Sequence, residues 1–511
     1  MERTSPPDPR APRRAVVIGA GFAGIAAAAT LARHGFAVEV LEKNDGPGGR
    51  AGVWREGGFT FDMGPSFYWM PEVFERFFAA FGTQAREHYE LRRLDPSYRI
   101  VFGPGNELTL PASREAQRQL FESLEPGAAA ASDRYLAEAR VKYDLGMGDL
   151  VYRPSLSWLE YAHLGMLRGL LRTTVFRSLR SHVADHFTDH RLRSLMEFPA
   201  LFLGATPQRT PALYSLMNHA DLELGTWYPS GGMGRVVEAM VRVAESQGAR
   251  FHYRDPVARI LVEQGRIAGV ETMHRRIGAD VVIGAADYHH VEQELLPAGS
   301  RQYTEGYWAK RRLAPSSLLF FLGCDLRLPR LEHHTLFFDE PLDAHAAEIH
   351  DRPRWPSKPL FYASCPSRTD PSVAPPGHEC LTLLIPIAPG LNDDERTRER
   401  YYGIVMQRLE RYLGIDLRPH VVVKRSYCIN DLVADHNAFG GNAYGLANTL
   451  TQTGPLRPRM KSSKVKGLYF AGQLTVPGPG VPPAIISGQV AGKLAHHETR
   501  SATTAQRTDP A

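Results

Sequence analysis

The start of the chain alternates between apolar strand patterns and an apolar helix pattern. Residues 15–18 form a β-branched run that is typical of a buried parallel strand, and the Ala- and Leu-rich stretch that ends at His34 predicts a helix. A second strand-like run covers residues 38–41 and ends at Glu42. This order predicts a parallel α/β unit.

Separated segments further along the chain repeat these patterns. The sequence predicts a helix over 236–247, a hairpin over 260–270 and a buried strand over 279–285. Near the end, residues 467–473 indicate a strand followed by a glycine turn, and a helix is predicted from Ala484. The α/β pattern is therefore spread over most of the chain.

Three glycines stand between the first strand and the first helix. Gly19 permits a tight turn, Gly21 lets the backbone approach a pyrophosphate, and Gly24 lets the helix pack close to the strand. Free N–H groups at the helix start would face the phosphates. Glu42 lies 18 residues after Gly24, where a carboxylate would bind the ribose hydroxyls. The combination predicts a dinucleotide site without separating NAD from FAD.

A second glycine cluster, residues 46–49, follows Glu42 and ends in Arg50. A cation on a glycine loop beside a dinucleotide fits a contact of Gly49 and Arg50 with the pyrophosphate or the ribityl chain. An ordinary loop with a solvated arginine is the alternative. Together with residues 61–65, Phe-Asp-Met-Gly-Pro, this pairing resembles the amine-oxidase-like flavoprotein superfamily, in which the cofactor is FAD.

Composition narrows the class of protein. The 511 residues have ordinary shares of apolar and charged side chains, which excludes a disordered chain, a fibre and a coiled coil. The net charge of +5 is small and gives no case for nucleic acid. The four cysteines form no CxxC pair, so a reducing compartment is expected. The apolar run 15–32 also resembles a signal peptide, but its glycine spacing and the strand that follows favour the nucleotide site.

Longer motifs extend the resemblance over nearly the whole chain, which is similar to the bacterial-type phytoene desaturases, a family of carotenoid-forming flavoenzymes. The motifs that carry the similarity are residues 16–32, 41–52, 59–71, 201–204, 225–229, 285–290, 441–448 and 468–492. One departure is that residues 475–478 are Thr-Val-Pro-Gly where many members have Thr-His-Pro-Gly. The chain thus lacks that histidine as an acid or base, and we interpret the variant as the mark of a desaturase subgroup.

The resemblance implies an α/β fold, with a Rossmann-type FAD-binding domain assembled from discontinuous segments and an inserted α+β substrate-binding domain. The expected FAD-binding parts are residues 13–105, 227–300 and 441–497. The expected substrate parts are residues 106–226, which would also contact the membrane, and 301–440. The polar ends, residues 1–12 and 498–511, are expected to be disordered.

The resemblance also places further residues at the FAD, with Val257 near the adenine. They are Gly64, Pro65, Val257, Gly472, Gln473, Val481 and Pro482. Prolines at a helix start lose only N–H groups that lack helical partners, and the remaining dipole would stabilise negative charge on a reduced flavin. A proline-rich surface loop is the alternative for residues 477–483.

The implied activity is that of a FAD-dependent oxidoreductase acting on CH–CH groups, which converts phytoene through partly desaturated carotenes toward lycopene. A hydride would pass to flavin N5, and a quinone or oxygen would take the electrons. Because the emerging cation is delocalised and no Ser-His-Asp, CxxC or HExxH arrangement is found, no catalytic side chain is assigned. The adjacent histidine pairs point apart, so no metal is expected.

One region of the sequence predicts contact with a membrane surface. Residues 151–195 hold seven arginines, no lysine and three acidic residues, and residues 156–172 place apolar side chains on one arc of a predicted helix. This pattern predicts peripheral attachment of a cytoplasmic enzyme to the inner membrane, with a domain-packing helix as the alternative.

The sequence alone leaves other functions open. The rivals are a related carotenoid isomerase, a desaturase of hydroxylated or diapocarotenoid polyenes, a flavin oxidase of amines or porphyrinogens, and a prenyl-lipid carrier that does not use flavin. The intact dinucleotide residues Gly19, Gly21, Gly24, Glu42 and Arg50 argue against the carrier.

Overall fold

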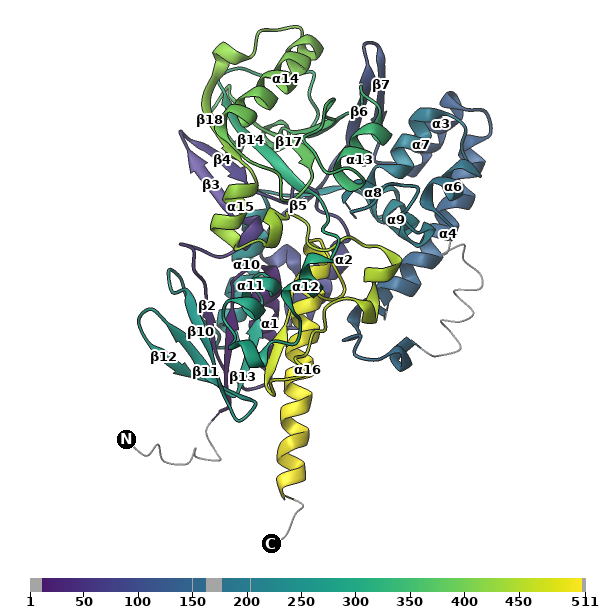
Figure 1. Cartoon of the computed structure of the whole chain (residues 1–511). Helices are drawn as coiled ribbons and strands as arrows, with labels where there is room; N and C mark the ends of the chain where they lie inside the picture. The colour runs from purple at the N-terminus through teal and green to yellow at the C-terminus, as the bar shows by residue number, and fades with distance from the viewer. Residues whose placement is uncertain (1–11, 149, 162–176, 203, 508–511) are drawn as a thin grey trace.

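The computed structural model describes residues 12–148, 150–161, 177–202 and 204–507. In the lower left of Figure 1, a parallel sheet has the strand order β19-β13-β1-β2-β9. Its strands are β19 (Leu468–Phe470), β13 (Val281–Gly284), β1 (Arg14–Ile18), β2 (Ala37–Leu41) and β9 (Arg250–His252). Neighbouring strands thus come from three distant parts of the chain. The Rossmann-type α/β fold built from discontinuous segments is confirmed.

Two helices cross closely beside this sheet. Helix α1 (Phe22–Arg33) follows β1, and its residues up to Ala32 are buried. Helix α16 (Val481–Arg507) packs against it at Gly488, where a Cβ atom would overlap the carbonyl oxygen of Ala23. Only glycine allows this approach of the two backbones.

Helix α16 continues through residues 498–507, where the composition predicts a disordered tail. This helical end differs from that expectation because Glu498 is bound to the body of the protein. Lys461 Nζ lies 2.5 Å from Glu498 Oε1, and Tyr469 Oη donates to Glu498 Oε2 at 2.8 Å. Contacts between residues that are far apart in the sequence therefore stabilise a helix that the local composition does not favour.

A second, mixed sheet lies above the first in Figure 1, with the order β18-β14-β17-β16-β15-β6-β7. Only the β15–β6 pair of these ladders is parallel among the described residues. The strands are β18 (Val421–Tyr427), β14 (Ser316–Cys324), β17 (Glu379–Ile387), β16 (Phe361–Ser364), β15 (His334–Phe337), β6 (Tyr98–Gly103) and β7 (Asn106–Leu110). The boundary expected at residue 105 therefore falls inside the β6–β7 hairpin, which belongs to this sheet.

The two faces of this mixed sheet have different partners. On one face, Phe320 contacts Tyr402 of helix α14 (Glu395–Leu413), with ring centroids 5.3 Å apart. On the other face, Phe321 contacts Phe61 of β4 (Phe59–Asp62) at 5.7 Å. The second face is thus turned toward the segment that leads into residues 62–65.

Further elements complete the two domains. Near the parallel sheet are α2 (Pro71–Ala79), α10 (Met233–Ser246), β10 (Val257–Glu263), β11 (Arg266–Thr272), β12 (Arg276–Gly278), α11 (Tyr288–Gln293) and α12 (Glu305–Ala309). Strand β3 (Val53–Glu56) pairs with β4 beside the mixed sheet, where Trp54 contacts Phe321. The helices on the right of Figure 1 include α3 (Arg114–Leu124), α4 (Ala128–Gly148), α6 (Leu179–Ala184), α7 (His190–Glu197), α8 (Pro199–Phe202) and α9 (Leu216–Leu222). The remaining elements include β5 (Leu91–Arg93), β8 (Trp227–Pro229), α13 (Leu342–His350) and α15 (Ile429–His436).

No helix among these described residues is long and apolar enough to span a membrane. Residues 162–176, which contain most of the predicted membrane-surface helix, lie outside the described ranges.

Candidate flavin site

The two glycine clusters found in the sequence pack directly on each other. Gly48 N donates to Ala20 O at 2.8 Å, and Gly21 and Gly48 form an isolated bridge. A Cβ atom on Gly49 would lie 3.4 Å from the Cα atom of Gly21. The structure thus brings the loop after β1 and the loop after β2 together at one end of the parallel sheet.

Gly21 and Gly24 have different roles at the start of α1. A Cβ atom on Gly24 would overlap the carbonyl oxygen of Gly19, so Gly24 is required for the turn itself. A Cβ atom on Gly21 would meet only Gly48 O, at 3.9 Å, and no side chain caps the helix. The open space at the N-terminus of a helix fits an anionic group such as a pyrophosphate.

Glu42 holds the glycine loop at the end of β2. Its side chain is buried, with Oε2 accepting a hydrogen bond from Ala20 N (2.8 Å) and Oε1 accepting one from Asn44 N (2.9 Å). A carboxylate has further acceptor capacity that could bind ribose hydroxyls. Asp255 N donates to Glu42 O at 2.9 Å, and the nearby Val257 is buried in the core.

Arg50 lies among polar groups from three other segments. Its Nη2 atom is 3.9 Å from Asp287 Oδ2 and donates to Asn442 O at 3.4 Å. In the amide orientation that satisfies its neighbours, Gln473 Oε1 accepts from the same nitrogen at 3.1 Å. The Nε atom is buried and has no hydrogen-bond partner in the described part of the chain. Arg50 is therefore not a freely solvated loop residue, and its unsatisfied donor fits an anionic cofactor.

Asp287 is a site residue that the sequence reasoning did not single out. It accepts hydrogen bonds from His289 N (3.1 Å), at the start of α11, and from Phe439 N (3.2 Å). Burial raises the pKa of Asp287, while Arg50 opposes that shift. Burial likewise lowers the pKa of Arg50, and Asp287 opposes it. The available sequence signal was an aspartate in the N-cap position of a short helix.

Gly64 and Pro65 follow a capping aspartate. Asp62 Oδ2 accepts from Met233 N (2.8 Å) and Oδ1 accepts from Gly234 N (3.2 Å), which fixes the start of α10. Burial raises the pKa of Asp62 to about 6. A Cβ atom on Gly64 would overlap the carbonyl oxygen of Arg50, so this segment packs tightly on the second glycine loop.

The C-terminal site residues lie between β19 and α16. Gly472 has a φ of +112° and donates from its N–H to Ser487 Oγ at 3.0 Å, which ties the turn to the helix. Val481 and Pro482 form the first residues of α16, as the Pro-Gly pattern of the sequence indicated. The start of α16 and the start of α1 therefore belong to helices that pack against each other.

Arg457 is a site residue that the sequence does not predict, because it lies in no recognisable motif. It is 3% exposed, and its guanidinium donates to carbonyl or amide oxygens of five residues. These are Thr475 (3.0 Å), Asn448 (2.7 Å), Gln452 (3.1 Å), Leu446 (3.1 Å) and Gln473 (3.1 Å). Burial lowers the pKa of Arg457 to about 10. A buried cation thus stands directly behind the turn that holds Gln473.

The described residues include no cluster of three side chains suited to a metal ion. The groups that line the site are the open start of α1, the unsatisfied Nε donor of Arg50 and the hydrogen-bonded carboxylate of Glu42. They suit an organic anion with ribose hydroxyls.

Residues 22–492 match the family of flavin-containing amine oxidoreductases. The chain belongs to this family. It is 42% identical to a carotenoid 3,4-desaturase of Haloarcula japonica over 93% of this chain and 96% of the relative. It is also 35% identical to a zeta-carotene-forming phytoene desaturase of Myxococcus xanthus, over 94% of this chain and 93% of the relative. Within the flavin-containing amine oxidoreductases, the protein thus belongs with the carotenoid desaturases.

A solved structure supports the fold of this flavin-containing amine oxidoreductase. An oxidoreductase from Methanosarcina mazei superposes with a TM-score of 0.61 over 94% of this chain and 100% of that chain, at 18% sequence identity. The family assignment makes the protein a flavin-dependent oxidoreductase, and the amine-oxidase-like resemblance stated from the motifs is confirmed.

Proposed function

We propose that this protein is a FAD-dependent carotenoid desaturase that acts on phytoene and partly desaturated carotenes. The observation that carries the proposal is the open start of α1 between two packed glycine loops, beside the unsatisfied Nε of Arg50. The names of the Haloarcula and Myxococcus relatives support a carotenoid as the substrate.

When bound, FAD supplies a hydride acceptor at N5, and a quinone or oxygen later takes the electrons. The chain would hold the cofactor through Gly21 and Glu42 at the ADP half and through Arg50 and Gln473 further along. The start of α16 and the buried Arg457 would supply positive potential to a reduced flavin. The proposal assigns no side chain as the base.

We also propose a peripheral membrane surface for a cytoplasmic enzyme at the inner membrane, formed by apolar side chains at the start of the predicted segment 156–172. Trp158 and Leu159 are 62% and 82% exposed on the short helix η4 (Trp158–Tyr161). Large apolar side chains at such exposure suit a lipid interface.

Two of the arginines expected to attract lipid have protein partners instead. Arg177 Nη1 lies 2.5 Å from Asp185 Oδ2. Arg180 pairs with both Glu197 and Asp343, each at 2.6 Å. Arg168 and Arg172 lie outside the described residues. Arg177 and Arg180, which are part of the arginine excess, therefore form ion pairs within the protein.

A second candidate is 3,4-desaturation of a different carotenoid, and the name of the 42% identical relative supports it. Expression in a phytoene-accumulating bacterium, followed by identification of the pigment, tests the first candidate. Anaerobic addition of phytoene to the purified yellow protein should bleach the flavin. A flavin that no acyclic polyene bleaches would contradict both candidates.

A further inference from the structure

A cavity of about 310 Å³ lies between α2, α4 and the short helix η3 (Leu150–Tyr152). This volume is at the lower end of the range of small-ligand sites. Its walls include the buried side chains of Val73 and Tyr143 and the partly exposed ones of Met147 and Tyr152. None of the described residues that line it belongs to the candidate flavin site.

Charged side chains line the same cavity. They are Glu72 and Arg76 of α2 and Asp144 of α4, and all three residues are exposed to solvent. A hydrocarbon in this cavity would remove water from these charges and give them no partner, which costs free energy. The cavity therefore suits a charged ligand better than it suits a polyene.

Glu72 and Arg76 are four residues apart on α2, a spacing at which opposite charges commonly pair. No ion pair joins them in the described part of the chain. A tyrosine from another element binds each of them instead. Tyr143 Oη donates to Glu72 Oε1, and the guanidinium of Arg76 lies over the ring of Tyr152, 4.6 Å from its centroid. The two tyrosines thus hold a carboxylate and a guanidinium apart at one cavity.

Both charges keep capacity for a ligand. Burial, reinforced by the hydrogen bond to Glu72, raises the pKa of Tyr143, so the phenol keeps its proton and stays a donor. It occupies Oε1 of Glu72, and a carboxylate has further acceptor sites. Arg76 forms no ion pair with any described carboxylate, and a guanidinium binds phosphate through two N–H groups. Separated charges of both signs match a zwitterion.

The cavity is close to the proposed membrane surface. Trp158, the first residue of η4, follows Tyr152 by six positions, so the two Cα atoms are at most about 22 Å apart. Val141, two positions before Tyr143 on α4, is a further exposed apolar residue, at 45%. A charged cavity beside exposed apolar side chains suits a ligand with a zwitterionic head and an apolar tail.

We propose that this cavity binds the phosphoethanolamine headgroup of a membrane phospholipid. Arg76 binds the phosphate, while Glu72 and Asp144 bind the primary ammonium group, which has three N–H donors. Asp144 is available because its ion pair with Arg140, at 3.8 Å, joins two exposed side chains. The inference rests on the proposed peripheral membrane surface and names its lipid, and it does not depend on which carotenoid is the substrate.

Short-chain phospholipids test the site on the purified, flavin-loaded protein. Three lipids with the same acyl chains carry a phosphoethanolamine, phosphocholine or phosphoglycerol headgroup, and calorimetric titration below the micelle concentration gives each Kd. We expect the ethanolamine lipid to have a Kd about ten-fold lower than the other two, because only its ammonium group donates hydrogen bonds to the carboxylates. Free phosphoethanolamine should bind more weakly than the lipid, and equally tight binding would overturn the assignment to a lipid.

Two variants separate the two charges. Glu72→Gln keeps an oxygen that can accept from Tyr143, and it should bring the three Kd values close together. Arg76→Gln should raise all three Kd values about ten-fold. The matched controls are Glu75→Gln on α2 and Arg86→Gln on η2 (Ala85–Glu87), because both residues are exposed and do not line the cavity. These controls should leave the Kd values unchanged.

Equal Kd values for the three headgroups in the wild type, or an unchanged preference in Glu72→Gln, would overturn the inference. Co-sedimentation with vesicles in that case would leave the membrane surface at η4 in place without this lipid site. A protein that binds neither the short-chain lipids nor vesicles would remove the membrane surface and the inference together. The desaturase proposal has its own test in the pigment that the enzyme forms.

Discussion

Arg457 Nη2 donates to the backbone carbonyl of Gln473 at 3.1 Å, which joins a buried cation to the turn after β19. The same guanidinium donates from Nε to Thr475 O at 3.0 Å. No carboxylate forms a salt bridge with Arg457 in the described structure, so its positive charge is offset only by oxygen dipoles. This arrangement organises the turn and leaves a positive potential behind it.

Arg457→Met should destabilise the protein and change the flavin. Loss of the guanidinium leaves several buried acceptors unsatisfied, so the free energy of unfolding should fall by about 3 kcal/mol or more. The midpoint potential of any retained flavin should become more negative, because the cation no longer stabilises the reduced form. Arg457→Lys keeps the charge and should keep the potential nearer to that of the wild type. Equal midpoint potentials in the two variants would show that the positive charge at position 457 does not influence the flavin potential.

Substitution of two glycines should separate cofactor binding from folding. Gly21→Val places a side chain in the open space at the start of α1, so we expect a folded but colourless protein. Gly24→Val would collide with the carbonyl of Gly19, so it should prevent folding. Circular dichroism and the flavin content of the purified proteins provide the measurement. Gly403→Val is the control, since a Cβ atom there meets nothing within 4 Å. Full flavin retention by Gly21→Val would contradict the site assignment.

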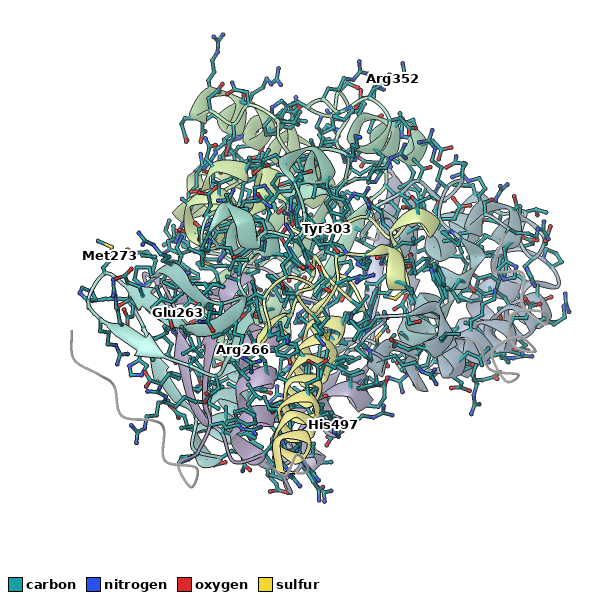
Figure 2. All side chains as sticks on the ribbon, turned by 60° about the horizontal axis from the view of Figure 1, so that its bottom comes forward. Glu263, Arg266, Met273, Tyr303, Arg352 and His497 are labelled. Carbon is teal, nitrogen blue, oxygen red and sulfur yellow. The ribbon has the colours of Figure 1, made fainter. Side chains whose placement is uncertain are left out.

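Membrane attachment should depend on apolar residues more than on the paired arginines. The double variant Trp158→Ser, Leu159→Ser should lower co-sedimentation with vesicles that contain anionic lipid. Met273→Ser is the matched control, because Met273 is 75% exposed on the β11–β12 hairpin at the outer edge of the protein (Figure 2). If the control lowers binding as much as the double variant, η4 is not the lipid surface.

Asp221 should make stability depend on pH. Tyr98 Oη donates to it at 2.5 Å, and burial raises the pKa of Asp221 from 3.8 to about 7. The folded protein therefore keeps this carboxyl protonated to higher pH than the unfolded chain does. The raised pKa of Asp221 therefore contributes fully to the free energy of unfolding below pH 3.8, and this contribution is lost as the pH rises to 7. The contribution is at most about 4 kcal/mol.

Asp221→Asn should remove this dependence. The stability of the variant relative to the wild type should then increase between pH 4 and pH 7 in urea unfolding experiments. Parallel pH profiles for the two proteins would show that Asp221 does not titrate in this range.

Local patterns determined much of the cofactor domain. The strand before Gly19, the helix after Gly24 and the strand that ends at Glu42 all occur where the sequence predicts them. Apolar periodicity and glycine placement act over a few residues, so a sequence carries these signals directly. The sequence marks both glycine clusters, but the contact of Gly21 with Gly48 arises only in the fold, where the parallel sheet brings the two loops together.

The sequence by itself determined a flavin-type α/β fold and the identity of the loops that build its site. Only the tertiary structure decided which polar groups these loops meet. Contacts between distant segments place Asp287 beside Arg50 and Arg457 beside Gln473. The same applies to Glu498, whose long-range bonds support a helix where composition favours disorder. Burial and pairing of charges depend on such contacts, and no local pattern encodes them.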